Sequence, residues 1–150
     1  MNKQTRNIIN VSLTLIAIYF YSFTANNIET EILGFNSFKF LISIAVLIQF
    51  LIFLPSFIFK TEKFYDLTGS LTYISVTSIA YFSLDNPTTT DTILFLYVVI
   101  WAGRLGIFLF RRINKVGKDV RFDKAKKKFF WFLQYWMGQA AWVVFTAGAS

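Results

Sequence analysis

Five long apolar stretches constrain the fold of this 150-residue chain more than any other feature. They cover residues 8–23, 38–59, 64–84, 93–110 and 129–147. A helix needs about 20 predominantly apolar residues to cross the hydrocarbon core of a bilayer, and these stretches are close to that length. The sequence therefore predicts one all-α membrane domain over residues 1–150, a polytopic helix bundle of about five transmembrane helices.

The first stretch allows a second interpretation. Lys3 and Arg6 precede it, and a signal peptide also begins with basic residues before an apolar core. No convincing small-x-small cleavage site follows, and the aromatic cluster at 19–21 is typical of a membrane interface. We therefore favour an uncleaved helix.

Composition supports a lipid environment and narrows the possible chemistry. Hydrophobic residues make up 55% of the chain and charged residues only 15%, which does not suit a water-facing surface. The net charge of +7 does not indicate a nucleic-acid partner, because the basic residues lie between apolar runs rather than on a separate module. The absence of Cys and His excludes disulfides, thiolate nucleophiles, imidazole bases and the usual zinc and haem ligands.

The basic residues predict the orientation of the bundle. With the amino terminus inside, 13 of the 15 Lys and Arg residues lie on the cytoplasmic side, nine of them between Arg111 and Lys128. Only Lys39 lies outside, and Arg104 lies within a span. Because cytoplasmic loops carry an excess of Lys and Arg, this bias predicts a multi-pass protein of the cell inner membrane with a cytoplasmic amino terminus.

Apart from Lys39 at the start of the second span, the charged residues inside predicted spans are Asp66 in the third and Arg104 in the fourth. Such residues are costly in a bilayer and often mark function. Asp66 lies about 5 Å and Arg104 about 10 Å from the cytoplasmic ends of their spans, at 1.5 Å per residue. We therefore expect that they could meet across neighbouring antiparallel helices.

Helical spacing extends this hypothesis to a polar, aromatic-walled cleft that opens to the cytoplasm. Residues three or four positions apart share one face of a helix. The third span would contribute Asp66, Gly69, Ser70, Tyr73 and Thr77, and the fourth Tyr97, Trp101, Arg104, Phe108 and Arg111. The alternative is structural: Asp66 caps its helix, Arg104 extends to the headgroups, and the small polar residues tighten helix packing.

The long basic loop from Arg111 to Lys128 also has two interpretations. Clustered Arg and Lys suit the recognition of a phosphorylated cofactor. The alternative, which the sequence alone favours, is a topology anchor that attracts anionic lipid. No Gly-rich nucleotide-binding motif and no serine-hydrolase motif accompanies it.

Three segments resemble the bacterial steroid 5-alpha-reductase-like membrane family, much of which has no known function. They are residues 60–73 (KTEKFYDLTGSLTY), 101–106 (WAGRLG) and 117–123 (GKDVRFD). The resemblance extends from about Lys60 to the end of the chain. It implies a multi-helix membrane reductase that transfers hydride from NADPH, bound from the cytoplasm, to a carbon–carbon double bond of a lipophilic substrate.

The resemblance also implies roles for individual residues. Asp66 matches a catalytic carboxylate that would orient or protonate the substrate carbonyl. Trp101 lies near an aromatic substrate-polarising position but lacks a hydroxyl, so Tyr73 or Tyr97 would have to supply it. The basic positions that approach the cofactor match Arg104, Arg111, Arg112 and Lys115.

The related reductases continue with further helices that build much of the cofactor site, and this chain lacks that segment. The expectation is therefore the amino-terminal portion of a longer enzyme, or a half-protein that needs a partner subunit and is inactive alone. The alternative is a non-enzymatic membrane subunit whose basic loop binds anionic lipid or a partner protein. A small transporter is disfavoured because no pair of broken helices is apparent.

Overall fold

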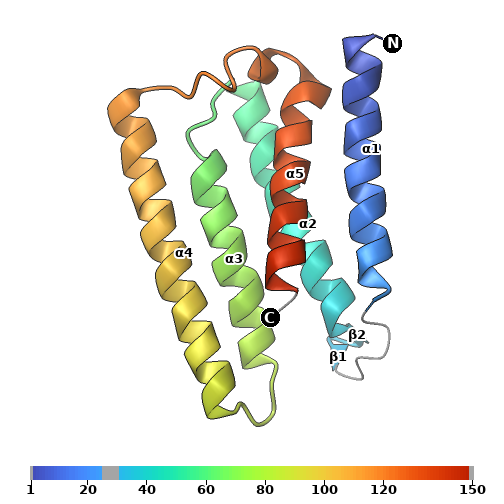
Figure 1. Cartoon of the computed structure of the whole chain (residues 1–150), viewed down its shortest axis with the longest axis vertical. Coiled ribbons are helices and arrows are strands. Elements are labelled where there is room, and N and C mark those ends of the chain that lie inside the picture. Colours follow the sequence, from blue (N-terminus) through green and yellow to red (C-terminus); the bar gives the residue numbers. More distant parts are fainter. Residues whose placement is uncertain (1, 25–30, 149–150) are drawn as a thin grey trace.

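The computed structural model describes residues 2–24 and 31–148, which form an up-and-down bundle of five α-helices (Figure 1). A short 3₁₀ turn, η1 (Ala125–Lys127), precedes the last helix. The helices are α1 (Lys3–Ser22), α2 (Ser37–Ile58), α3 (Tyr65–Phe82), α4 (Thr89–Val116) and α5 (Phe129–Ala147). Each predicted apolar stretch coincides with one helix, so the helical character of the predicted bundle is confirmed.

The length of α4 differs most from the prediction, which placed this span at 93–110. A capping box starts the helix early: the Thr88 hydroxyl accepts a hydrogen bond from the Asp91 N–H, and the Asp91 carboxylate accepts one from the Thr88 N–H. Gly117, at φ 89°, ends it. The first basic residues of the predicted loop at 111–128 are therefore helical.

A short β-hairpin, which was not predicted from the sequence, lies directly before α2. Strand β1 (Glu31–Ile32) pairs antiparallel with β2 (Phe35–Asn36). Leu33 and Gly34 between them have φ values of 54° and 78°. Positive φ at both positions is typical of a two-residue hairpin turn whose twist matches its strands.

The last helix in the sequence is central in the bundle. α5 packs against α1, α2 and α3, whereas α4 lies at one edge and packs mainly on α3 (Figure 1). Phe53 of α2 is fully buried against the rings of Phe132 and Trp136 of α5. This arrangement leaves the side of α4 that faces away from α3 without a partner among the described residues.

The two ends of the bundle differ chemically. The "basic end" comprises the starts of α1, α3 and α5, the ends of α2 and α4, and connections 59–64 and 117–128; most of the Lys and Arg residues lie there. The "hairpin end" holds β1, β2 and connection 83–88 (Figure 1). Among the described helices, α2 and α4 are long and apolar enough to cross a membrane, on length and composition alone. The five spans and the cytoplasmic amino terminus remain predictions.

Candidate functional site

The candidate site begins in the interface between α3 and α4, where side chains meet in antiparallel register. The ring of Tyr73 packs edge-on against Trp101, with centroids 5.3 Å apart. Nearer the basic end, a carboxylate oxygen of Asp66 lies 3.7 Å from a guanidinium nitrogen of Arg112. Thus two of the three segments that carry the family resemblance lie along one interface and lead to the basic end.

The two helices are in direct contact, so they do not enclose the cleft that the sequence predicted. Gly106 of α4 lies against Ser70 of α3, and a Cβ at Gly106 would be only 2.7 Å from the Cβ and Oγ of Ser70. Tyr97 and Phe108, expected to line the cleft, are 72% and 62% exposed on the outer side of α4. The residues predicted to line a cleft instead divide between the packed α3–α4 interface and the exposed side of α4.

Connection 117–128, the third resembling segment included, is folded onto the basic end. Glu62, in the turn before α3, is buried. One oxygen of its carboxylate accepts a hydrogen bond from the Asp119 N–H at 3.0 Å, and the other accepts one from Lys126 Nζ at 2.7 Å. A buried carboxylate needs such partners, and here they attach the connection to α3.

An aromatic anchor holds the same connection. Phe122 is 1% exposed and its ring lies 4.9 Å from the rings of both Tyr65 and Tyr135, measured between centroids. The Tyr65 hydroxyl donates a hydrogen bond to the Tyr135 carbonyl at 3.0 Å. The basic connection is therefore packed at its centre rather than solvated along its whole length.

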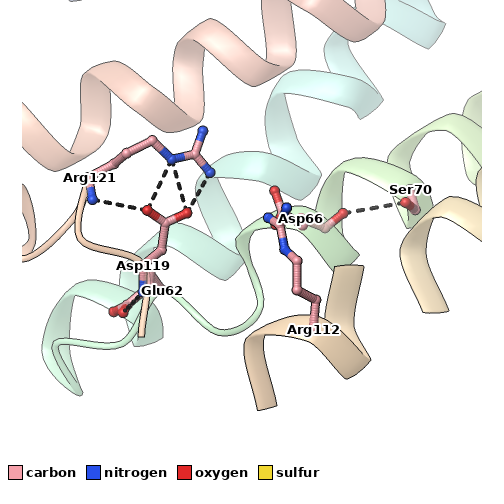
Figure 2. Close-up of polar contacts among 6 residues, drawn as sticks. All are labelled: Glu62, Asp66, Ser70, Arg112, Asp119 and Arg121. Atoms are coloured by element: carbon pink, nitrogen blue, oxygen red, sulfur yellow. Dashed lines mark hydrogen bonds and ion pairs between the residues drawn. The ribbon is translucent and has the colours of Figure 1, made fainter. Parts of the chain in front are cut away.

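A second charge pair lies beside the Asp66–Arg112 pair (Figure 2). Arg121 Nε and Nη2 donate hydrogen bonds to the carboxylate of Asp119, at 2.9 Å and 2.5 Å to Oδ2. These bonds hold the pKa of the Asp119 carboxyl below its ordinary value. The charges of Arg121, Arg112 and Asp119 all act on Asp66, so these four residues form one electrostatic cluster.

The lowered pKa of Asp119 predicts that the connection loosens in acid. Its carboxylate contributes stability in full above the unfolded pKa of about 3.9 and loses that contribution as the pH falls through the lower folded pKa. We expect amide protection factors across 117–128, measured by hydrogen exchange, to decrease as the pH falls through the folded pKa of Asp119. Asp119→Asn should abolish this pH step, whereas Asp123→Asn in the same connection should retain it. An unchanged step in Asp119→Asn would contradict this assignment.

The structure separates the predicted site residues into two groups. Asp66 and Arg112 meet, whereas Arg104, expected to approach Asp66, is exposed and has no ion-pair partner among the described residues. The Tyr73 hydroxyl is hydrogen-bonded to Thr146 of α5. Tyr97 lies 15 residues before Arg112, about 22 Å along α4. The structure therefore does not bring Tyr97 together with Asp66.

The remaining predicted cations share an outward stripe. Arg104, Arg111 and Lys115 recur after seven and four residues, which places them on one face of α4. All three are exposed. They are called the cationic stripe below.

Sequence reasoning missed the buried acid that attaches the connection. Glu62 and Asp119 belong to the segments quoted for the resemblance, but neither was predicted to be part of the site. A usable signal was Phe122, one apolar ring in a run of charged residues. An isolated aromatic residue in a basic loop often indicates that the loop packs against the protein.

The comparisons with known proteins give one finding. A family model described as "Protein of unknown function (DUF1295)" matches residues 52–149. This range includes all three resembling segments. No curated protein and no solved structure matches the chain.

Proposed function

The chain belongs to the DUF1295 family of proteins of unknown function, and we propose that it forms the membrane-embedded part of an NADPH-dependent reductase. The reaction would saturate a carbon–carbon double bond in a lipophilic substrate, steroid-like or isoprenoid in character. The proposal places the protein in the cell inner membrane as a multi-pass protein, with the basic end in the cytoplasm.

One observation supports this proposal above the others. Asp66, the acid expected to contact substrate, lies at the basic end within an interface built from the resembling segments, beside Arg112 and close to the folded connection. Its side chain is 21% exposed, so a ligand can reach it. An accessible carboxylate among cations at a helix end suits a site that combines a polar cofactor with an apolar substrate.

The described residues fit one part of the cofactor. Exposed guanidinium and ammonium groups of the cationic stripe suit the phosphates of NADPH. The cationic stripe is exposed along α4, and the two pockets described for this chain include neither the stripe nor Asp66. The proposal therefore needs a second wall.

The open side of α4 is where such a wall would pack. Arg104 lies in an apolar helix with no ion-pair partner among the described residues, and a charge facing lipid at that depth is costly. A further membrane helix or a partner subunit would cover it, with an anionic group opposite Arg104. This requirement agrees with the expectation that the chain alone is inactive.

The chain's own residues would orient the substrate. NADPH, when bound, supplies a hydride to one carbon of the double bond, and a proton completes the other. The Asp66 carboxyl would orient or protonate the substrate carbonyl. The Asp66–Arg112 contact, together with the Gly106–Ser70 contact, would fix the position of that carboxyl relative to the cationic stripe.

The test uses cell membranes that contain the chain at its native level, compared with membranes from cells that lack it. Loss of NADPH absorbance and saturated product are measured with progesterone, a steroid enone, and with a polyprenyl enone. Asp66→Asn should lower kcat by about 10²- to 10⁴-fold, the usual contribution of a proton-transferring group. Arg111→Gln should instead raise the KM for NADPH.

Asp85→Asn, in the connection between α3 and α4, is the matched control and should leave the rate unchanged. The proposal is wrong if membranes with and without the chain reduce both enones equally. It is also wrong if Asp66→Asn, shown to be folded, reduces them at the wild-type rate.

The second candidate function is a non-enzymatic membrane subunit whose basic connection binds anionic lipid or a partner protein. Lys124, Lys127 and Lys128 favour it, because they are exposed and have no ion-pair partner among the described residues. This candidate predicts tighter binding of phosphatidylglycerol than of phosphatidylcholine to the purified chain, and loss of that preference when the three lysines become Gln. Asp66→Asn would then affect stability alone.

A further inference from the structure

The hairpin end contains a pocket that the proposed reductase site does not use. Helices α2, α3, α4 and α5 surround a cavity of about 430 Å³, a size typical of small-molecule sites. Its inner wall is apolar and includes Ile42, Ala45, Val76 and Val98. Val76 lies ten residues after Asp66, about 15 Å along α3. The cavity is therefore separate from the charge cluster of the basic end.

The mouth of this pocket carries negative charge only. Glu31 and Asp91 are the charged members of its described lining, which includes no Lys or Arg. The Asp91 carboxylate is already bonded to Thr88 at the start of α4. The nearby Lys39 lies with its ammonium 5.1 Å from the centre of the Phe23 ring, and Lys39 is not part of the lining. A ligand head group at the mouth would therefore meet the exposed Glu31 carboxylate, with the Asp91 carboxylate as a second negative charge in the lining.

A second feature fixes the shape of the wall below the mouth. The ring of Tyr81 stacks on Phe95 with centroids 4.4 Å apart, and the Tyr81 hydroxyl is 3.0 Å from the Thr92 hydroxyl. Both rings belong to the lining. Because α3 and α4 are joined there by stacking and a hydrogen bond, the wall is already formed without a ligand.

We propose that this pocket binds a lipophilic amine, with its apolar chain between the four helices and its ammonium group beside Glu31. An apolar interior favours any alkyl chain, and the carboxylates at the mouth select among head groups: they attract a cation and repel an anion. The proposal does not depend on the reductase reaction, since it concerns binding without NADPH. Failure of either proposal leaves the other intact.

Native mass spectrometry of the full chain, released from detergent, tests this with three ligands of equal chain length. Dodecylamine, dodecan-1-ol and dodecanoic acid are each added at the same concentration. We expect the amine to be retained at least about tenfold more than the acid, with the alcohol between them. Glu31→Gln should lower retention of the amine toward that of the alcohol, with Asp91 as the remaining carboxylate of the lining, and Asp85→Asn, an acid of the same end outside the lining, should leave retention unchanged.

Two filling variants test the location of the site. Val98→Trp from α4 and Ala80→Leu from α3 both reduce the cavity, and each should lower retention of all three ligands. Thermal unfolding shows which of the two variants is folded. Ligand retention by a folded variant then tests whether the ligand binds in this cavity. Equal retention of amine, alcohol and acid would overturn the proposal. So would unchanged amine retention in Glu31→Gln or in a folded filling variant.

Discussion

Replacing Glu62 with Ala is expected to destabilise the folded chain by about 3–5 kcal/mol, the usual cost of removing one partner from a buried ion pair. The Glu62 side chain is 3% exposed and that of Lys126 is 19% exposed. The substitution leaves the Lys126 ammonium without its 2.7 Å partner and the Asp119 N–H without its acceptor. The measurement is chemical unfolding in a mild detergent, followed by tryptophan fluorescence.

Neighbouring lysines provide the matched control. Lys126→Met should also destabilise, because it leaves the buried carboxylate without its cation, whereas Lys127→Met, at an exposed position, should change the free energy of unfolding by less than about 0.5 kcal/mol. The double variant Glu62→Ala with Lys126→Met removes both charges, so its loss should be smaller than the sum of the two single losses. Strictly additive losses would show that the two side chains do not interact.

Replacing Gly106 with Ala should destabilise by about 1–3 kcal/mol, as overpacking does in a close-packed interface. The new Cβ would meet the Cβ and Oγ of Ser70 at 2.7 Å, and the Ser70 Cβ cannot rotate away from the α3 backbone. The two helices would have to separate. Chemical unfolding of the variant measures the loss, and the fluorescence of Trp101 reports the altered interface.

The same helix supplies the control for this substitution. A Cβ at Gly103 meets nothing within 4 Å, so Gly103→Ala should stabilise the chain by about 0.5–1 kcal/mol through the higher helix propensity of Ala. Ser70→Gly in the Gly106→Ala background should restore most of the loss, because it removes the atoms that clash. If Gly103→Ala and Gly106→Ala behave alike, the close approach of α3 and α4 is not present in solution.

The positions of the five helices could be predicted because apolar length is a strong local signal. Their ends were less certain, and α4 shows why. Charged residues after 110 indicated a loop, but Arg and Lys are good helix formers, and the stop signal lies at Gly117. The hairpin at 31–36 depends on positive φ at Leu33, a residue that rarely adopts it.

Of the candidate site, only the position of Asp66 near a cation of α4 could be anticipated from helical spacing. Asp66 was expected near a cation of the fourth span, and it meets Arg112 rather than Arg104. The Gly106–Ser70 contact sets the register between the helices, and a contact of this kind cannot be read from the period of one helix. The attachment of Glu62 to Asp119 and Lys126 spans 57 and 64 positions, a separation that local patterns do not encode.

The central place of α5 has a consequence for the order of assembly. Because synthesis proceeds from the amino terminus, α1, α2 and α3 are made before α5, the helix that joins them. Until then Phe53 lacks the rings of Phe132 and Trp136 that bury it, and Phe122 lacks Tyr135. The contacts that bury Phe53 and Phe122 are therefore non-local, and we expect them to form late, once α5 has been synthesised.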